Sequence, residues 1–289
     1  MHTFETPAPI DVELDLVIGD ARVIAGDRSD TIVDVAPGDP ASAADVTAAE
    51  KTTVEFRDGT LVVKAPRQRG YLGIGSGKGA SVRATVQVPA GSRVRGAVQE
   101  GGYDFEGLLG SCDLRTGSGD IALGQVGPAR LKTDLGDVTV SRVAGDAEVS
   151  TGGGKLRIRA IEGTAVIKNL AGDSEIGDIA GDAKLRASAG DLVVRRTRAG
   201  LTAKTDAGRI MVDEVSQGKV SLTSGGGGLE VGIREGVAAW VDAQSETGSV
   251  RNLLDDSGKP AATARTVEVH ARTQFGDIVV RRATADPLD

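Results

Sequence analysis

The sequence predicts an all-β fold, a parallel β-solenoid with about 18 residues per turn. Three observations support this: glycines recur at a fixed interval, apolar residues alternate between the glycines, and few aromatic residues are available for a core. The chain has 41 Gly but only four Phe, two Tyr and one Trp among 289 residues. Such a composition favours a thin core of Val, Ile, Leu and Ala, in which each repeat packs on its two neighbours.

The glycine interval defines the repeat. One series recurs at the interval of the whole turn, and a second series falls about halfway between its members. Each repeat therefore has two turns, separated by segments of about nine residues. The first series is Gly101, Gly119, Gly136, Gly154, Gly172, Gly190 and Gly208; the second is Gly110, Gly127, Gly145, Gly163, Gly181, Gly200 and Gly218.

Apolar residues between the turns alternate with polar ones, which is the period of a strand. Ala147, Val149 and Thr151 share one face, and Leu156 and Ile158 share the next. Stacked strands of this kind lie about 4.8 Å apart, and each pairs with the coil on either side. The position before the second turn predicts one buried column: Val126, Val143, Ile161, Ile179, Thr197, Val215 and Ile233.

The ends are expected to be irregular caps on one continuous domain. We divide the chain into 1–95 (N-terminal coil, hairpin and cap), 96–254 (regular repeats) and 255–289 (closing strands and tail). Ile10 to Asp20 is predicted to form a first coil that ends in Gly19-Asp20. Residues 36–51 are expected to hold about one helical turn, and Asp58-Gly59 the turn of a hairpin over 53–64. A glycine-rich loop is expected over 66–79.

Composition also restricts location and partners. The N-terminus has no basic cluster followed by an apolar run, and no stretch is long and apolar enough to span a membrane. One cysteine, Cys112, excludes an internal disulfide, so we expect a cytoplasmic protein. A net charge of −7 argues against non-specific binding to nucleic acid. A protein partner or self-association remains open.

Several segments match the pattern of a known family. They are Gly-Ser-Gly-Asp-Ile-Ala-Leu (117–123), Gly-Asp-Val-Thr-Val (136–140), Val-Pro-Ala-Gly-Ser (88–92) and the closing block 267–282. These resemble the DUF4097 family of bacterial β-strand-repeat proteins, often described as adhesins, and the block 236–242 is similar to its actinobacterial members. The resemblance implies a single-stranded right-handed parallel β-helix without assigned catalysis, cofactor or functional residues.

Motifs that suggest chemistry have simpler interpretations. The loop Gly70 to Gly79 lacks the first Gly of a P-loop, where Leu72 stands, and the Ser or Thr after Lys78. Asp120, Asp137 and Asp191 lie beside inward residues, so their alternation is wrong for a calcium-binding repeat and favours side chains that bond turn N–H groups. We therefore expect no catalytic residues, no metal and no cofactor.

Four inward or outward assignments follow from the alternation. The column of Thr116, Thr133, Thr151, Asn169, Thr205 and Ser224 should point inward and satisfy turn backbone groups. Cys112 should be a small buried residue, and His270 should be exposed. For Trp240, two ways of counting the repeat register disagree. We favour the count back from Gly248, which places Trp240 on the outer face. There it should be partly covered by the 254–265 loop or by a partner chain.

One outward column is basic. Arg115, Lys132, Lys168, Arg186 and Lys204 recur at the same position, with Ser150 as the one interruption. Stacked like charges are mildly unfavourable, so the column is either a face balanced by neighbouring acids or a candidate binding face for an anionic polymer or partner.

The predicted function is a non-catalytic scaffold or interaction protein that presents strand faces to a partner, itself included. The alternatives are an anionic-polymer-binding module and a polysaccharide-active enzyme of the β-helix type. The enzyme would need clustered carboxylates beside an aromatic-lined groove, and the sequence offers few aromatics.

Overall fold

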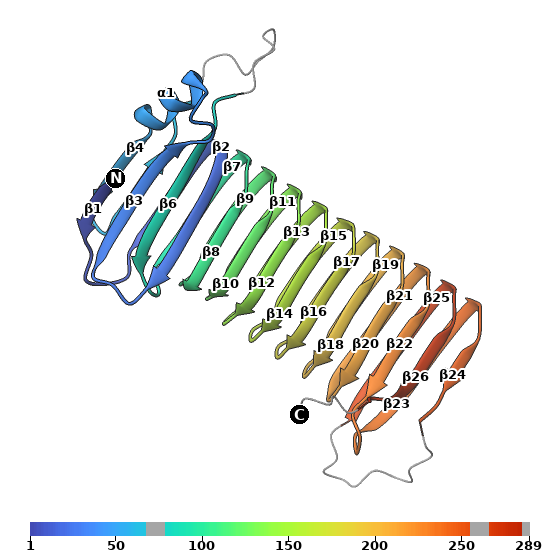
Figure 1. Cartoon of the computed structure of the whole chain (residues 1–289). Coiled ribbons are helices and arrows are strands. Elements are labelled where there is room, and N and C mark those ends of the chain that lie inside the picture. Colours follow the sequence, from blue (N-terminus) through green and yellow to red (C-terminus); the bar gives the residue numbers. More distant parts are fainter. Residues whose placement is uncertain (68–78, 255–265, 285–289) are drawn as a thin grey trace. The chain divides into compact units, whose positions relative to one another are not determined.

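The computed structural model describes residues 1–67, 79–254 and 266–284 and confirms an all-β, parallel solenoid. Each turn of the solenoid, here called a coil, contributes one strand to a sheet A and one to a sheet B (Figure 1). The chain divides into two units, Met1–Ser141 and Arg142–Asp289, and the boundary falls inside β12 (Val138–Val143). The glycine-rich loop expected over 66–79 lies almost wholly outside the described residues.

The first unit begins with an antiparallel cap. Strand β1 (His2–Glu5) pairs with β3 (Asp30–Pro37), β3 pairs with β6 (Val82–Pro89), and β4 (Thr53–Arg57) forms a hairpin with β5 (Thr60–Lys64). The predicted turn Asp58-Gly59 joins the hairpin strands, and both residues have positive φ. The helix α1 (Ala43–Lys51), capped by Ser42, is longer than the single turn we expected.

The long strand β2 (Asp11–Gly26) corrects our prediction for the N-terminal coil. It does not end at Gly19-Asp20; the positive φ of Gly19 only bends it from sheet B into sheet A. Its first half lies between β5 and β7 (Arg93–Glu100), and its second half between β6 and β8 (Tyr103–Leu108). The first long strand of the chain is therefore an inner strand of its unit, because a later segment pairs outside it.

The remaining coils of the first unit are regular. β9 (Cys112–Ser118) pairs with β7 and with β11 (Ala129–Leu135), and β10 (Ile121–Val126) pairs with β8. The buried rings of Tyr103 and Phe105 lie edge to face, and an atom added at Gly96 would lie 2.7 Å from the Tyr103 ring. Gly96 thus leaves the space that this tyrosine fills.

The second unit repeats one coil after another. Its sheet B strands are β13 (Ala147–Gly153), β15 (Ala165–Ala171), β17 (Ala183–Ala189), β19 (Leu201–Ala207) and β21 (Gly218–Gly226). Its sheet A strands are β14 (Leu156–Ile161), β16 (Ser174–Ile179), β18 (Leu192–Thr197), β20 (Ile210–Val215) and β22 (Leu229–Ile233).

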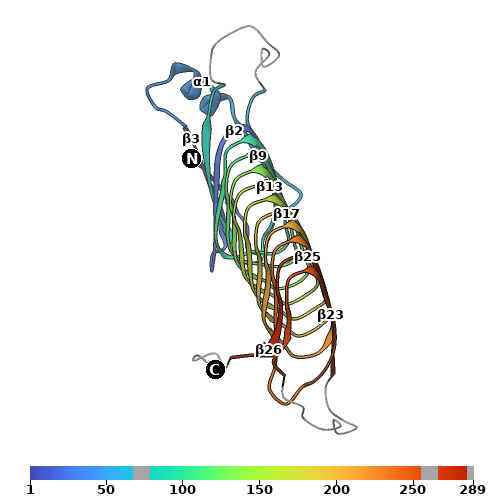
Figure 2. The same ribbon diagram turned by 90° about the vertical axis from the view of Figure 1, so that its right-hand side faces the viewer.

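The last four strands do not follow chain order. β23 (Ala238–Thr247) and β24 (Val250–Asn252) come first in the sequence, but β25 (Thr266–Phe275) lies between β21 and β23. Likewise β26 (Ile278–Arg282) lies between β22 and β24. Figure 2 shows the two layers that these strands form.

The core matches the predicted alternation. Every member of the column from Val126 to Ile233 is at most 1% exposed, and in the second unit Ile161 pairs with Ile179 and Thr197 with Val215. The hydroxyl column is also confirmed: Thr116 donates to the carbonyl of Gly101 at 2.7 Å, and Ser224 to that of Gly208 at 2.9 Å. Both side chains are buried.

Candidate functional site

The predicted basic column separates into two parts with different surroundings. In the first unit Arg115 pairs in register with Lys132, but each cation lies near an acid of its own strand. The Arg115 guanidinium is 3.8 Å from Asp113, and the Lys132 amine is 3.7 Å from Asp134. For these two residues the column is balanced by neighbouring carboxylates.

In the second unit the cations of this column have no ion pair among the described residues. Lys168, Arg186 and Lys204 occupy matching positions on β15, β17 and β19, and all three are exposed. Lys184, two residues before Arg186, adds a fourth cation to the same outer face. Within residues 1–67, 79–254 and 266–284, none of the four forms an ion pair. We call Lys168, Lys184, Arg186 and Lys204 the basic patch.

Sheet A of the same unit shows the opposite arrangement. Glu175 bridges Arg157 at 3.2 Å and Arg195 at 3.1 Å, and these bonds, that to Arg195 foremost, lower the pKa of its carboxyl. Arg281 lies 2.7 Å from Glu230. The unpaired state of the basic patch is therefore not a general property of this surface, because stacked strands elsewhere place acids opposite their arginines.

Local geometry explains how the patch side chains are brought together. Inward residues of β15, β17 and β19 are buried, so the alternate residues must all face outward. The parallel register then places equivalent positions side by side about 4.8 Å apart. Outward positions on these three strands are Val166, Lys168, Leu170, Lys184, Arg186, Ser188, Thr202, Lys204 and Asp206.

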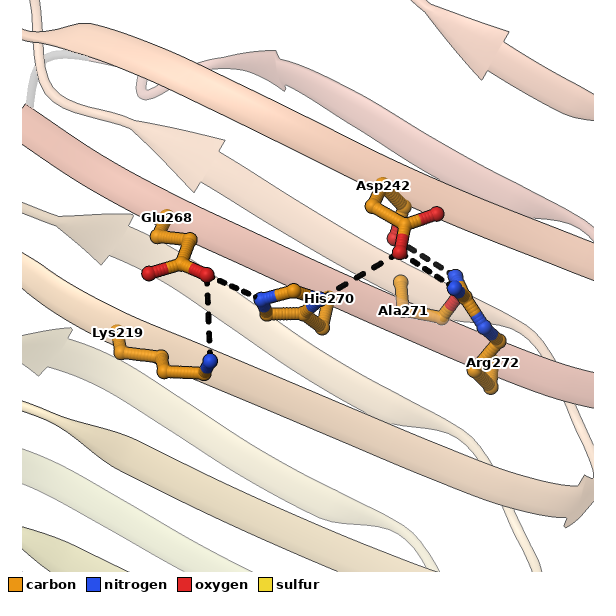
Figure 3. A network of polar contacts seen from close by, with 6 residues as sticks. All are labelled: Lys219, Asp242, Glu268, His270, Ala271 and Arg272. Atoms are coloured by element: carbon orange, nitrogen blue, oxygen red, sulfur yellow. Dashed lines mark hydrogen bonds and ion pairs between the residues drawn. The ribbon is translucent and has the colours of Figure 1, made fainter.

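A second polar cluster lies on the same face, at β21, β25 and β23. Glu268 accepts from Lys219 at 3.2 Å and lies 2.5 Å from the His270 ring, while Asp242 binds Arg272 at 2.5 Å and lies 3.5 Å from His270 (Figure 3). The bond to Arg272 is the main cause of the lowered pKa of Asp242, and the bond to His270 has that effect on the pKa of Glu268. This cluster satisfies its own charges and ties three strands together.

Trp240 lies beside this cluster on the outer face, as one of the two counts predicted. Its side chain is 57% exposed, and its ring meets that of His270 edge to face at 5.2 Å. The loop expected to cover it lies outside the described residues. His270 points outward, but it is not freely exposed as we expected: its side chain is 26% exposed because Glu268, Asp242 and Trp240 surround it.

The turn aspartates and the cysteine have structural roles. Asp120 accepts from the N–H of Asp137 at 2.8 Å, and Asp191 from that of Arg209 at 2.8 Å, as the sequence predicted. Cys112 is buried, and this burial raises the pKa of its thiol to about 12. Among the residues that the structure describes, no group of three or more His, Cys, Asp or Glu could hold a metal ion.

Comparison with known proteins identifies the family. The model of the family "Toastrack DUF4097" matches residues 27–281. The chain belongs to the Toastrack DUF4097 family. No curated protein matches the chain. No helix in the described part of the chain is long and apolar enough to cross a membrane.

Three solved structures of similar extent resemble the chain at low identity. A "putative adhesin" from Bacteroides fragilis has 10% identity and a TM-score of 0.31, covering 96% of this chain and 95% of its own. A "putative lipid binding protein" from Parabacteroides distasonis has 10% identity and a TM-score of 0.37, covering 98% and 96%. A "putative adhesin" from Parabacteroides merdae has 10% identity and a TM-score of 0.34, covering 98% and 95%. The function proposed below rests on this chain's own residues.

Proposed function

We propose that this Toastrack chain is a non-catalytic interaction scaffold, and that the outer face of sheet B in the second unit is its binding face. The observation that carries the proposal is the basic patch, in which four cations on adjacent strands have no ion pair among the described residues. A folded surface that keeps unpaired like charges close together forgoes stability, and an anionic partner supplies the missing counter-charges.

The scaffold role is supported by how the patch is built. Its side chains project from strands whose inward neighbours are fully buried, so their backbone positions are fixed by the core. The other outward residues of β15, β17 and β19 are Val166, Leu170, Ser188, Thr202 and Asp206, which include neither a histidine nor a pair of carboxylates. Rigid presentation of charge is what this surface can do chemically.

The first test uses adsorption to a sulfonate-bearing cation-exchange resin at low salt and neutral pH. A protein of net charge −7 should not be retained unless one face is locally basic. We expect the wild type to be retained and the triple variant Lys168→Ser, Arg186→Ser and Lys204→Ser to elute at once. Serine is chosen because Ser150 already occupies this column on β13.

A matched control removes three cations from other surfaces. Lys51→Ser, Arg159→Ser and Arg198→Ser change the net charge by the same amount and leave the patch intact, so this variant should remain bound. Equal elution of both triple variants would show that overall charge, not this face, governs adsorption. The absence of catalysis is tested by incubating the protein with acidic polysaccharides. New reducing ends or unsaturated sugar products would contradict it.

A further inference from the structure

Two hollows adjoin the basic patch and give it a more specific chemistry. One, of about 610 Å³, is lined by residues that include Lys184, Thr202 and Ser221. The other, of about 480 Å³, is lined by residues that include Lys204, Thr223 and Arg272. Both meet on β21. Its outward residues are Lys219, which lines the larger hollow and pairs with Glu268, and the small residues Ser221, Thr223 and Gly225. The small side chains of β21 lie between longer side chains of β19 and β25, so the surface is recessed along β21.

The lining of the hollows is rich in groups that hydrogen-bond to neutral hydroxyls. Thr202, Ser221 and Thr223 supply hydroxyls, and Gln244 and Gln274 supply amides that both donate and accept. The carboxylates that line the hollows can accept from sugar hydroxyls; they are Asp182, Asp206 and Glu246. None of the residues that line the two hollows is aromatic. Single-stranded nucleic acids are held mainly by aromatic stacking in addition to cations, so this surface does not suit them.

Aliphatic side chains complete the face. Val166 is 39% exposed and Leu170 61% exposed, and they flank Lys168 on β15. Such side chains suit the C–H faces of sugar rings, and the larger hollow adds the apolar residues Ala165, Ala183 and Leu201 to this region. Cations, hydroxyl-bonding groups and aliphatic edges occur together in one region of sheet B.

Resting on the function proposed above, we propose that this region binds an acidic polysaccharide, a chain of sugar rings bearing carboxylates or sulfates. The anionic groups lie on Lys168, Arg186 and Lys204, which recur about every 4.8 Å across the strands, so the polymer crosses the strands of sheet B. Lys184 provides a second row, and the sugar hydroxyls enter the hollows on β21. The bonds to the cations are charge-assisted and carry most of the affinity.

The experiment is titration calorimetry with polygalacturonate at low salt. We expect binding by the wild type, a loss of affinity of about tenfold or more in the Lys168→Ser, Arg186→Ser, Lys204→Ser variant, and little change in the control triple variant. Affinity should fall as salt is added, because the contacts are solvent-exposed ion pairs.

A second variant separates this inference from the proposed function. Thr223→Leu fills a hollow and removes a hydroxyl but leaves every cation in place, so it should weaken polygalacturonate binding several-fold without changing retention on the resin. Ser188→Leu places the same side chain on the same face outside both hollows and should change neither measurement.

Two outcomes overturn the inference while the proposed function stands. One is tighter binding of polyphosphate or single-stranded DNA than of polygalacturonate and heparin, with resin retention still dependent on the patch. The other is equal polygalacturonate affinity in Thr223→Leu and the wild type. If the wild type is not retained on the resin and does not bind polygalacturonate, both the inference and the proposed function are overturned.

Discussion

Asn169 departs from the hydroxyl column that lines the turns. Thr133 and Thr205 each donate to one turn carbonyl, whereas the Asn169 amide nitrogen lies within hydrogen-bonding distance of Gly154, Gly172 and Ser174. Its carbonyl oxygen is the one buried side-chain polar atom in the described residues without a partner. A buried acceptor that is left unpaired costs free energy because it has given up its bond to water.

We therefore expect Asn169→Thr to raise the free energy of unfolding by about 1 kcal/mol, since threonine keeps a donor and introduces no orphaned amide oxygen. Thr205→Asn, at the matching position two coils away, should lower it by a similar amount. Urea denaturation of the two variants and the wild type measures both changes. A loss of stability in Asn169→Thr would show that the three contacts of the amide outweigh its unpaired oxygen.

The hydrogen bond accepted by Asp191 predicts that the stability of the fold depends on pH. Its carboxylate accepts from the backbone N–H of Arg209 at 2.8 Å, and this bond, with the Arg209 guanidinium, lowers its pKa below the usual 3.8. The unfolded chain therefore takes up the proton first as pH falls. The stabilisation is complete above the unfolded pKa and is lost as pH falls through the lower, folded value.

Asp191→Asn keeps an oxygen that can accept the N–H but removes the charge. The difference in unfolding free energy between wild type and variant should be largest at neutral pH and shrink as pH falls below about 4, where both side chains are neutral. Thermal melts of both proteins across this range test the sign. A difference that grows on acidification would contradict the assignment.

At the scale of elements, some glycines are required by the backbone around them and others are not. Gly190 has a φ of 128°, and a Cβ placed there would collide with the carbonyl oxygen of Gly172 in the preceding coil. Gly226 has no atom within 4 Å of the same added carbon, and Ala207 stands beside it in register. The neighbouring coil therefore leaves no room for a side chain at Gly190, whereas Gly226 is open.

Gly190→Ala should therefore destabilise the protein by about 2–4 kcal/mol, while Gly226→Ala should be neutral or slightly stabilising. The denaturation midpoints of the two variants can be compared directly, because each variant adds the same methyl group. Equal effects at both positions would mean that the turn at Gly190 relaxes to accept a side chain.

Strand register could be predicted from the sequence because every coil repeats the same alternation. Ile161 and Ile179 occupy equivalent positions of successive repeats and pair directly, so counting was enough. The candidate face could be predicted as a single column of cations. The acids that balance Arg115 and Lys132 are also visible in the sequence, because Asp113 and Asp134 stand two residues away from them. Lys184 was missed because it belongs to the neighbouring column. The 480 Å³ hollow was missed because it depends on which strand lies beside β21. That neighbour is β25, which β22, β23 and β24 separate from β21 in the sequence.

At the scale of the whole molecule, strand order departs from chain order near both ends of the chain. In the first unit β2 lies between strands that follow it, and in the second unit β25 and β26 lie inside β23 and β24. Local alternation contains no information about this, because each strand offers the same pattern of pairing edges to any neighbour. Insertion is decided by tertiary contacts.

Truncation after residue 265 tests the order at the C-terminal end. It removes β25 and β26, so β23 and β24 lose the only strands with which they pair in the described structure. Amide hydrogens of 238–252 should then exchange rapidly, although that segment is still present, whereas truncation after residue 284 should leave their protection unchanged. Hydrogen exchange followed by mass spectrometry reads out both proteins. Retained protection in the shorter chain would contradict the pairing.

The inserted position of β25 and β26 also affects where repeats can be gained or lost during evolution. Duplication of a single repeat within β15–β20 supplies one strand for each sheet and lengthens the stack by a coil, while the terminal pairings keep their partners. A duplication of the final strands would instead place two copies in competition for a single gap. Repeat number should therefore vary among relatives through gains and losses in the middle of the array.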